Sequence, residues 1–316
     1  MARARRRPLI VAAVDIGSYS VHLVVARVHG RELDSLHDES AFLNLGRSID
    51  AEGDIGSATP RLVATLTRYV AEARDLGAST VVVAGTDPLR RAPDAAAVRA
   101  EIARAAGVEV VVLSHEEEAL IALLGVQAGR PIIQETVVVD VGGGSTEVLV
   151  ADPRHEPVVA GLSLGAARLS GLLVANDPPL PSELGALADH AVAAFLDAPG
   201  AAPRAMIAVG GTARSLLRLG PPLSNRALSA RRIRAALQLL AAAPAVEVAE
   251  RYGIRPSRAL VLPAGASILL AALGHYHLDH LRVAKGGLRE GLMLARVHAG
   301  PSWREHIGDL ARGWDP

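Results

Sequence analysis

Two aspartates, Asp15 and Asp140, each follow an apolar run and precede a turn rich in glycine and serine. The first segment reads Asp-Ile-Gly-Ser-Tyr-Ser from Asp15, and the second reads Asp-Val-Gly-Gly-Gly-Ser-Thr-Glu from Asp140. Glycine lets the backbone approach a ligand closely and turn its N–H groups toward an anion. A carboxylate at such a turn suits Mg²⁺, which is commonly held by one or two carboxylates together with a phosphate. The two segments therefore predict a site for phosphate and a divalent metal.

The candidate residues of this site fall into two sets. The metal candidates are Asp15, Asp140 and Glu147, with Mg²⁺ as the expected ion and Mn²⁺ as its alternative. The expected phosphate ligands are the N–H and hydroxyl groups of Gly17, Ser18, Gly143, Gly144 and Ser145. The alternative is a pair of ordinary hairpin turns in which each aspartate caps its own loop. Two copies favour the phosphate site, and the chain contains neither a GxxxxGK[ST] phosphate loop nor a GxSxG esterase elbow.

Composition narrows the chemistry that is available. The chain has 316 residues, no cysteine and a single lysine, Lys285, so an anion site must use arginine, backbone N–H groups and metal. Since 33 Lys and Arg residues balance 33 Asp and Glu residues, no net charge attracts nucleic acid or a membrane. The basic run Met1–Pro8 lacks the apolar region and cleavage site of a signal peptide, and no apolar stretch looks long enough to cross a bilayer. We therefore expect a cytoplasmic protein with no nucleic-acid or membrane partner.

Short β-branched runs alternate with stretches rich in alanine and leucine, which is typical of an α/β protein. The expected strands are Ile10–Asp15, Val21–Val28, Val81–Gly85, Val108–Leu113, Thr136–Asp140, Glu147–Ala151, Met206–Gly210 and Leu281–Ala284. The expected helices include Pro60–Leu76, Ala95–Ala106, Glu116–Ala128, Arg231–Ala242 and Pro256–Leu273.

The two aspartate segments also indicate an internal duplication, because Asp15–Val25 can be aligned with Asp140–Val150. Each segment is expected to form a strand–turn–strand hairpin that opens one half of the molecule. The predicted domains are residues 1–125 and 126–298, followed by a C-terminal tail at 299–316. Two similar lobes imply a cleft that both hairpins face.

These motifs resemble those of the exopolyphosphatase/guanosine pentaphosphate phosphohydrolase family, in its short two-domain form, from about Ile10 to Ala295. The two glycine turns resemble the phosphate loops of that family. Ser114–Ala119, Val209–Thr212 and Gly287–Gly291 resemble its acidic segment, its later glycine turn and its C-terminal signature. The resemblance implies an α/β fold of two actin-like, ribonuclease H-like lobes, with mixed sheets flanked by helices and the active site in the interlobe cleft.

The resemblance also implies roles for two further residues, Glu118 as the catalytic base and Arg90 as a ligand of the substrate phosphate. Ser114 and Glu117 form an S-x-x-E capping box, so Glu117 is expected to be structural and Glu118 is left to activate water. A guanidinium suits bidentate contact with phosphate. The alternative for Arg90 is a surface position in the first turn of a helix.

Several positions depart from the family pattern or stay open. Tyr19 and His115 replace smaller residues of the family and are expected to line the substrate path. The Gly210–Gly211 turn is equally consistent with packing and with ligand contact. Gly287–Gly291 is expected to start a helix that fastens the C-terminal segment to the second lobe, rather than to form a site. His275–His280 is expected to be a solvated helix end, because its spacing fits no standard zinc motif.

The resemblance therefore leads us to expect a Mg²⁺-dependent exopolyphosphatase that removes terminal phosphates from inorganic polyphosphate. Short polyphosphate chains are the expected preference, because the chain ends soon after the second lobe. The alternatives are a guanosine pentaphosphate 5′-phosphohydrolase and an ATPase of the actin fold. A sensor that binds polyphosphate or an alarmone without turnover is the alternative outside enzymes. The expected partners are polyphosphate, guanosine penta- or tetraphosphate and, in a homodimer, a second copy of the chain.

Overall fold

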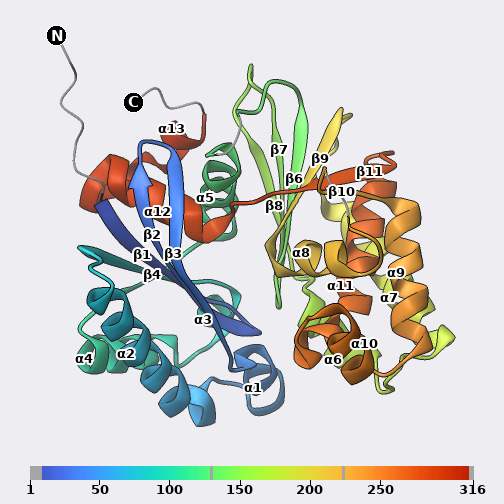
Figure 1. Cartoon of the computed structure of the whole chain (residues 1–316), viewed down its shortest axis with the longest axis horizontal. Coiled ribbons are helices and arrows are strands. Elements are labelled where there is room, and N and C mark those ends of the chain that lie inside the picture. Colours follow the sequence, from blue (N-terminus) through green and yellow to red (C-terminus); the bar gives the residue numbers. More distant parts are fainter. Residues whose placement is uncertain (1–8, 129–130, 223–224, 313–316) are drawn as a thin grey trace.

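The structure is a computed structural model that describes residues 9–128, 131–222 and 225–312. Within these ranges the chain forms two β-sheets, each covered by helices on both faces (Figure 1). The first has the strand order β3-β2-β1-β4-β5, and the second has the order β10-β11-β9-β6-β7-β8. The basic run expected before residue 9, and the tail after residue 312, lie outside the described residues.

The two sheets repeat one pairing scheme. In the first sheet, β1 pairs with β2 in antiparallel fashion and with β4 in parallel. In the second, β6 pairs in the same two ways with β7 and β9. The strands of the first sheet are β1 (Leu9–Ile16), β2 (Ser20–His29), β3 (Glu32–Phe42), β4 (Thr80–Gly85) and β5 (Val110–Val112). Those of the second are β6 (Thr136–Val141), β7 (Thr146–Ala151), β8 (Val158–Leu162), β9 (Ala205–Val209), β10 (Ala227–Ser229) and β11 (His280–Val283).

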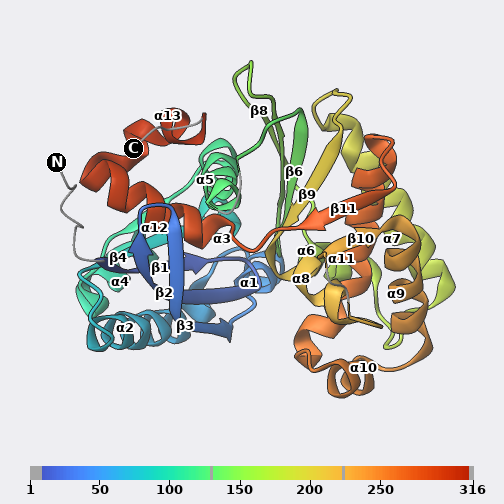
Figure 2. The same ribbon diagram turned by 45° about the horizontal axis from the view of Figure 1, so that its top comes forward.

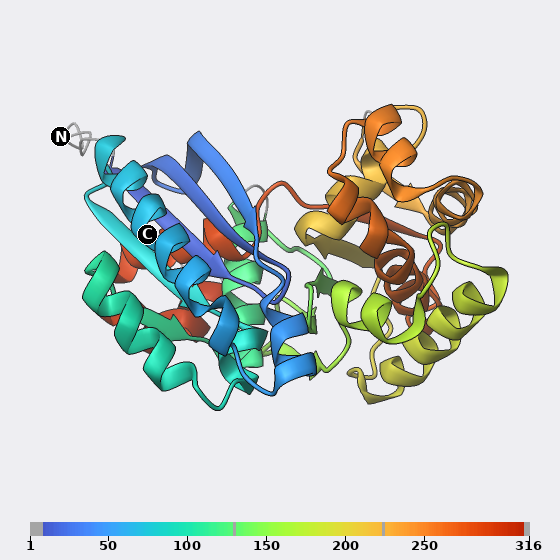
Figure 3. The ribbon, with the colours of Figure 1, turned by 90° about the horizontal axis from the view of Figure 1, so that it is seen from below.

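Alternation along β1 decides which helices cover each face of the first sheet. Ala12, Val14 and Ile16 point to a core shared with α2 (Thr59–Asp75) and α4 (Ala95–Ala106). Val11 and Ala13 point to the opposite core, which contains α5 (His115–Gln127) and α12 (Leu288–Ala299). Figure 3 shows α2 and α4 lying along one side of the strands.

In the second sheet, one face packs against α6 (Ala166–Leu173), α7 (Pro181–Ala194), α9 (Ala230–Ala242) and α11 (Pro256–His275). The other face packs against α5 through Ala119, Leu123 and Val126. Helix α5 therefore contacts both sheets, and Figure 2 shows it between them. The remaining helices are α1 (Leu45–Glu52), α3 (Asp87–Arg91), α8 (Gly210–Arg218), α10 (Ala245–Tyr252) and α13 (Ile307–Ala311), with 3₁₀ turns at Gly56–Ala58, Phe195–Asp197 and Gly300–His306.

The C-terminal segment does not follow the sequence-based expectation. Helix α12 begins at Leu288, as expected, but packs on the first sheet and α5 instead of the second lobe. Trp303, Ile307 and Leu310 are buried in the same core, so residues 300–311 are not a free tail. The apolar face of α12 packs against the face of β1 that α5 also covers, and this burial explains why α12 lies on the first lobe.

Helix α11 is long and apolar enough, by length and composition, to cross a membrane, with a mean hydropathy of 1.6. The expectation that no apolar stretch is long enough to cross a bilayer is therefore wrong. The same helix is the centre of the second lobe's core, and 72% of its apolar window is buried there. Its composition is thus explained by burial inside the fold.

Candidate functional site

Strand alternation directs three predicted acids toward helix α5 or α12. Asp15 shares the parity of Val11 and Ala13 on β1, so it faces the α5 and α12 side of the first sheet. Asp140 and Glu147 are register partners on β6 and β7, on the face of the second sheet that α5 covers. Since α5 contacts both faces, acids from the two sheets meet at its N-terminus.

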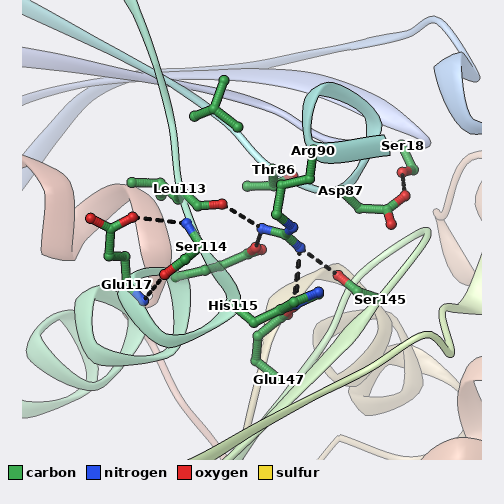
Figure 4. Close-up of polar contacts among 12 residues, drawn as sticks. Ser18, Thr86, Asp87, Arg90, Leu113, Ser114, His115, Glu117, Ser145 and Glu147 are labelled. Atoms are coloured by element: carbon green, nitrogen blue, oxygen red, sulfur yellow. Dashed lines mark hydrogen bonds and ion pairs between the residues drawn. The ribbon is translucent and has the colours of Figure 1, made fainter. Parts of the chain in front are cut away.

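Glu118 stands in the first turn of α5, and the capping box predicted beside it is present. The N–H of Glu117 donates to Ser114 Oγ at 3.1 Å, and the Ser114 N–H donates to Glu117 Oε2 at 2.8 Å (Figure 4). Glu117 also pairs with Arg304 on the outside of the helix. Glu117 is thereby structural, and Glu118, only 7% exposed, is directed to the lobe interface.

Arg90, on helix α3 directly after β4, connects the two lobes. Its guanidinium donates to Glu118 Oε2 at 2.6 Å and to the Leu113 carbonyl at 2.9 Å (Figure 4). It also lies 3.3 Å from Ser145 Oγ and 3.4 Å from Glu147 Oε1. Arg90 is therefore not a surface residue, and here it offsets the charge of carboxylates from both lobes.

His115 contacts both Arg90 and Glu147. Its Nδ1 lies 2.8 Å from Glu147 Oε1 and 3.1 Å from the Arg90 guanidinium. Its ring rests on Gly161 of β8, where an added Cβ would lie 2.2 Å from the ring carbon Cγ. Burial, together with the positive charge of Arg90, lowers the pKa of His115. His115 does not line the interlobe cavities, so the expectation that it lines the substrate path needs correction.

Burial raises the pKa of four carboxyl groups at this interface, those of Asp15, Glu118, Asp140 and Glu147. The pKa of Asp15 rises to about 6 and that of Asp140 to about 6, in both cases mainly by desolvation and against the pull of Arg289. Desolvation and the charge of Asp140 raise the pKa of Glu147 to about 8. Desolvation and the charge of Glu147 raise the pKa of Glu118 well above its usual range. Desolvation is the largest cause at all four carboxyls, so the nearby arginines do not fully offset the cost of burying their ionised forms.

These residues fit a hard divalent cation. Every candidate donor is an oxygen, and Asp15 Oδ1 is buried with no hydrogen-bond partner among the described residues. Within the part of the chain that the structure describes, no three cleft carboxylates place their oxygens within 4.8 Å of one another. Such spacing suits Mg²⁺ or Mn²⁺ held by one or two carboxylates, with water and substrate completing the shell.

The raised pKa values predict how stability depends on pH. Between the unfolded and native pKa values, the native carboxyls hold protons that the unfolded chain has released, so stability must fall as pH rises. His22 acts in the opposite sense below 6.5, because burial lowers its pKa to about 4. The melting temperature in EDTA should therefore fall between pH 6.5 and 8, and Mg²⁺ should raise it more at pH 8 than at pH 6.5. Calorimetry at constant ionic strength measures both; a flat or rising profile in EDTA would contradict the charge arrangement.

The backbone of the two hairpin tips is only partly available to a ligand. The N–H of Gly17 donates to the Ser20 carbonyl at 3.1 Å, which closes the first turn. Gly17 is therefore not a free donor, contrary to the sequence-based expectation. Among the described residues, the N–H groups of Ser18, Gly143 and Gly144 make no hydrogen bond. These three remain as candidate ligands of a phosphate, together with Ser145, whose hydroxyl lies 3.3 Å from the Arg90 guanidinium.

The tips of the two hairpins touch each other. A Cβ at Gly144 would lie 1.9 Å from Asp87 Oδ2, and one at Gly143 would lie 2.8 Å from Tyr19 Cβ. Ser18 Oγ donates to Asp87, which is 5% exposed (Figure 4). Sequence reasoning missed Asp87, because an acid in the first turn of a helix is common without any further role.

A cavity of about 460 Å³ opens between the lobes on one side of this contact. It is lined by Asp15, Glu118 and Asp140, whereas Arg90 and Glu147 lie behind its wall. Its cationic side chains are Arg214, Arg218, Arg255, Arg258 and Arg289. A second cavity, of about 770 Å³, lies on the other side of the hairpin tips and contains Arg47, Arg91 and Arg168.

Two segments left in doubt by the sequence reach the first cavity. Arg289, in the expected helix start, lies 3.6 Å from Asp15 Oδ2, so this segment both begins a helix and supplies a cleft residue. Gly210 has a φ of +87°, and an added Cβ there would lie 2.8 Å from Asp140 Oδ1. The Gly210–Gly211 turn therefore faces the cleft. Tyr19 lines it too, under the Arg258 guanidinium at 5.5 Å.

Comparison with known proteins adds four similarities. The model of the Ppx/GppA phosphatase family matches residues 24–299. The chain is 28% identical over 312 residues to exopolyphosphatase 1 of Mycobacterium tuberculosis, covering 91% of this chain and 88% of the other. It superimposes on the crystal structure of the Aquifex aeolicus Ppx/GppA family member with a TM-score of 0.78 at 26% identity, covering 93% and 99% of the two chains. An exopolyphosphatase from Cytophaga hutchinsonii, at 19% identity and a TM-score of 0.79, shares the fold over 92% and 98% of the two chains.

Proposed function

This chain belongs to the Ppx/GppA phosphatase family and has its actin-like two-lobe fold, as predicted, and we propose that it is an exopolyphosphatase acting with Mg²⁺ on inorganic polyphosphate. The observation that carries the proposal is the meeting of Glu118 and Glu147, from two lobes, at one arginine, Arg90, with Asp140 beside Glu147 in the sheet. The mycobacterial relative named as an exopolyphosphatase supports the choice of substrate class.

In the proposed reaction the terminal phosphate lies at the hairpin tips. The free N–H groups of Ser18, Gly143 and Gly144 bind its oxygens, and Arg90 exchanges a carboxylate partner for the phosphate. Phosphoryl transfer depends mainly on positioning and on neutralising charge, which these groups supply. One or two of Asp15, Asp140 and Glu147 would hold Mg²⁺ directly and the others through its water, and the ion would supply charge neutralisation at the phosphate.

Glu118 is the proposed base that orients and deprotonates the attacking water. A base must be within reach of the water and unprotonated at the working pH. Burial and the charge of Glu147 raise the pKa of Glu118, whereas Arg90 lowers it through its 2.6 Å contact. The proposed cation would lower the pKa of Glu118 from this raised value. Glu118 would then be ionised near neutral pH and still basic enough to accept a proton from water.

Guanosine pentaphosphate is the second candidate substrate. The Gly210–Gly211 turn and the Tyr19 ring line the same cavity as Asp140, and they offer a flat surface for more than a phosphate chain. An ATPase of the actin fold and a sensor without turnover remain as alternatives. We further propose that the protein prefers short polyphosphate, is cytoplasmic and forms a homodimer.

One assay separates these possibilities. Phosphate release is measured from short polyphosphate, long polyphosphate, guanosine pentaphosphate and ATP, each with Mg²⁺ and with EDTA. We expect Mg²⁺-dependent release that is fastest from short polyphosphate. Faster release from guanosine pentaphosphate would show that this nucleotide, and not polyphosphate, is the preferred substrate. Binding of polyphosphate without release from any of the four would favour the sensor.

A further inference from the structure

Three side chains with metal-binding atoms meet on the outside of the first lobe, away from the cleft. His37 and Glu39 lie two residues apart on β3, and Glu72 lies on α2. In the sheet His37 is opposite Val25 and Glu39 is opposite Leu23, both of which belong to the core under α2. Strand parity thus directs both side chains toward α2. The Nε2 of His37 and one oxygen of each glutamate all lie within 4.8 Å of one another.

Arg68 holds the two carboxylates in place. It contacts Glu39 Oε1 at 2.7 Å and Glu72 Oε1 at 2.6 Å, leaving the Oε2 atom of each glutamate toward the imidazole. His37 Nε2 lies 3.5 Å from Glu39 Oε2 and 3.9 Å from Glu72 Oε2. An outer partner that fixes the orientation of ligating carboxylates is a regular feature of metal sites.

Several buried polar atoms at this place make no hydrogen bond within the described part of the chain. Among the described residues, His37 Nε2 and Glu72 Oε2 are buried without a hydrogen bond. So is the hydroxyl of Tyr69, a residue with 0% exposure. Tyr69 precedes Glu72 by three residues on α2, so both side chains lie on the same face of the helix, and the Arg68 guanidinium lies 4.7 Å from the centre of the Tyr69 ring. Unpartnered buried polar atoms are costly, and a cation with its bound water would satisfy all three.

We propose that His37, Glu39 and Glu72 form a second cation site, which binds a divalent transition metal such as Zn²⁺. An imidazole with two carboxylates is a ligand set that such ions accept, and three protein ligands leave a position for water. The two carboxylates and Arg68 sum to one negative charge. The side chains of the three ligands are 32–35% exposed, so an ion can enter from solvent.

The site would fasten an edge strand. β3 is the outer strand of its sheet, and the residues that alternate with the ligands, Asp38 and Ser40, line the interlobe cavity. A cation bound by both β3 and α2 would therefore hold in place the strand that forms one wall of the cleft. This role is independent of the reaction in the cleft and does not rest on the proposed function.

Equilibrium dialysis and calorimetric titration with Zn²⁺, in excess Mg²⁺ to occupy the cleft carboxylates, test the site. We expect one bound Zn²⁺ per chain, and at least a tenfold loss of affinity in each of His37→Gln and Glu72→Gln. With Co²⁺ as the probe, the visible absorption of the bound ion should be lost in the same variants. His29→Ala removes another imidazole of the same sheet and should leave the affinity unchanged.

Circular dichroism first establishes that each variant is folded, and the two substitutions are near in size to the native side chains. Unchanged Zn²⁺ affinity in both folded variants would overturn the proposal. So would binding that Asp140→Asn abolishes, because the ion would then belong to the cleft. Loss of the Zn²⁺-induced rise in melting temperature in His37→Gln, with that rise retained in Asp140→Asn, would support it.

Discussion

Replacing Glu118 with Gln is expected to lower kcat for phosphate release by about 10²–10⁴-fold, the usual contribution of a positioned general base. Glutamine keeps the size of the side chain and can still accept the 2.6 Å hydrogen bond from Arg90, so the lobe interface should persist. It cannot take a proton from water. The loss should therefore fall on kcat, with little change in KM or in polyphosphate binding measured by titration.

Glu117→Gln is the matched control for this substitution. Glu117 is adjacent in sequence and has the same chemistry, but it closes the capping box and pairs with Arg304. Glutamine can still close the capping box and loses only the charge of the pair with Arg304, so stability should fall by at most about 1 kcal/mol and kcat should stay nearly unchanged. A Glu118→Gln enzyme with wild-type turnover, or equal losses in the two variants, would remove Glu118 from the role of base.

The parts of the site carried by local patterns were predictable from the sequence. The capping box at Ser114 and Glu117 depends on four consecutive residues and is present as expected. The hairpins after Asp15 and Asp140 follow from apolar runs that end in glycine turns, and both are present. In each of these cases the residues that determine the geometry are close neighbours in the chain.

The parts that depend on distant packing were not predictable in this way. Arg289 and Arg214 reach the cleft only because α12 packs on the first lobe and α8 follows β9. The segment around Arg289 resembles the C-terminal signature of the family, but nothing in its residues shows that the Arg289 side chain reaches the cleft. Strand β3 was missed as well, since its mostly polar residues lack the apolar alternation of a half-buried strand. Its position at the sheet edge and over α2 explains that composition.

Replacing Asp140 with Asn should have a comparably large effect, through the proposed Mg²⁺ rather than the proposed base. Loss of a metal ligand at a phosphoryl-transfer site is expected to lower activity by about 10²–10³-fold, since the ion supplies several kcal/mol of charge stabilisation. The asparagine side chain would keep the shape of the turn against Gly210 but not the charge. The Mg²⁺-induced rise in melting temperature should shrink with the activity.

The stability of the metal-free protein distinguishes more sharply between a metal-binding and a structural role of Asp140. Burial raises the pKa of Asp140 to about 6, so at pH 8 the metal-free native state holds an unfavourable buried charge there. Asp140→Asn should then melt at a higher temperature than the native chain in EDTA at pH 8, and at a lower temperature in excess Mg²⁺. Asp152→Asn, which alters a carboxylate just beyond β7 that pairs with Arg154, should show neither change. If Asp140→Asn were less stable than the native chain in both conditions, the aspartate would be a structural group of the turn, and the metal would have to be held elsewhere.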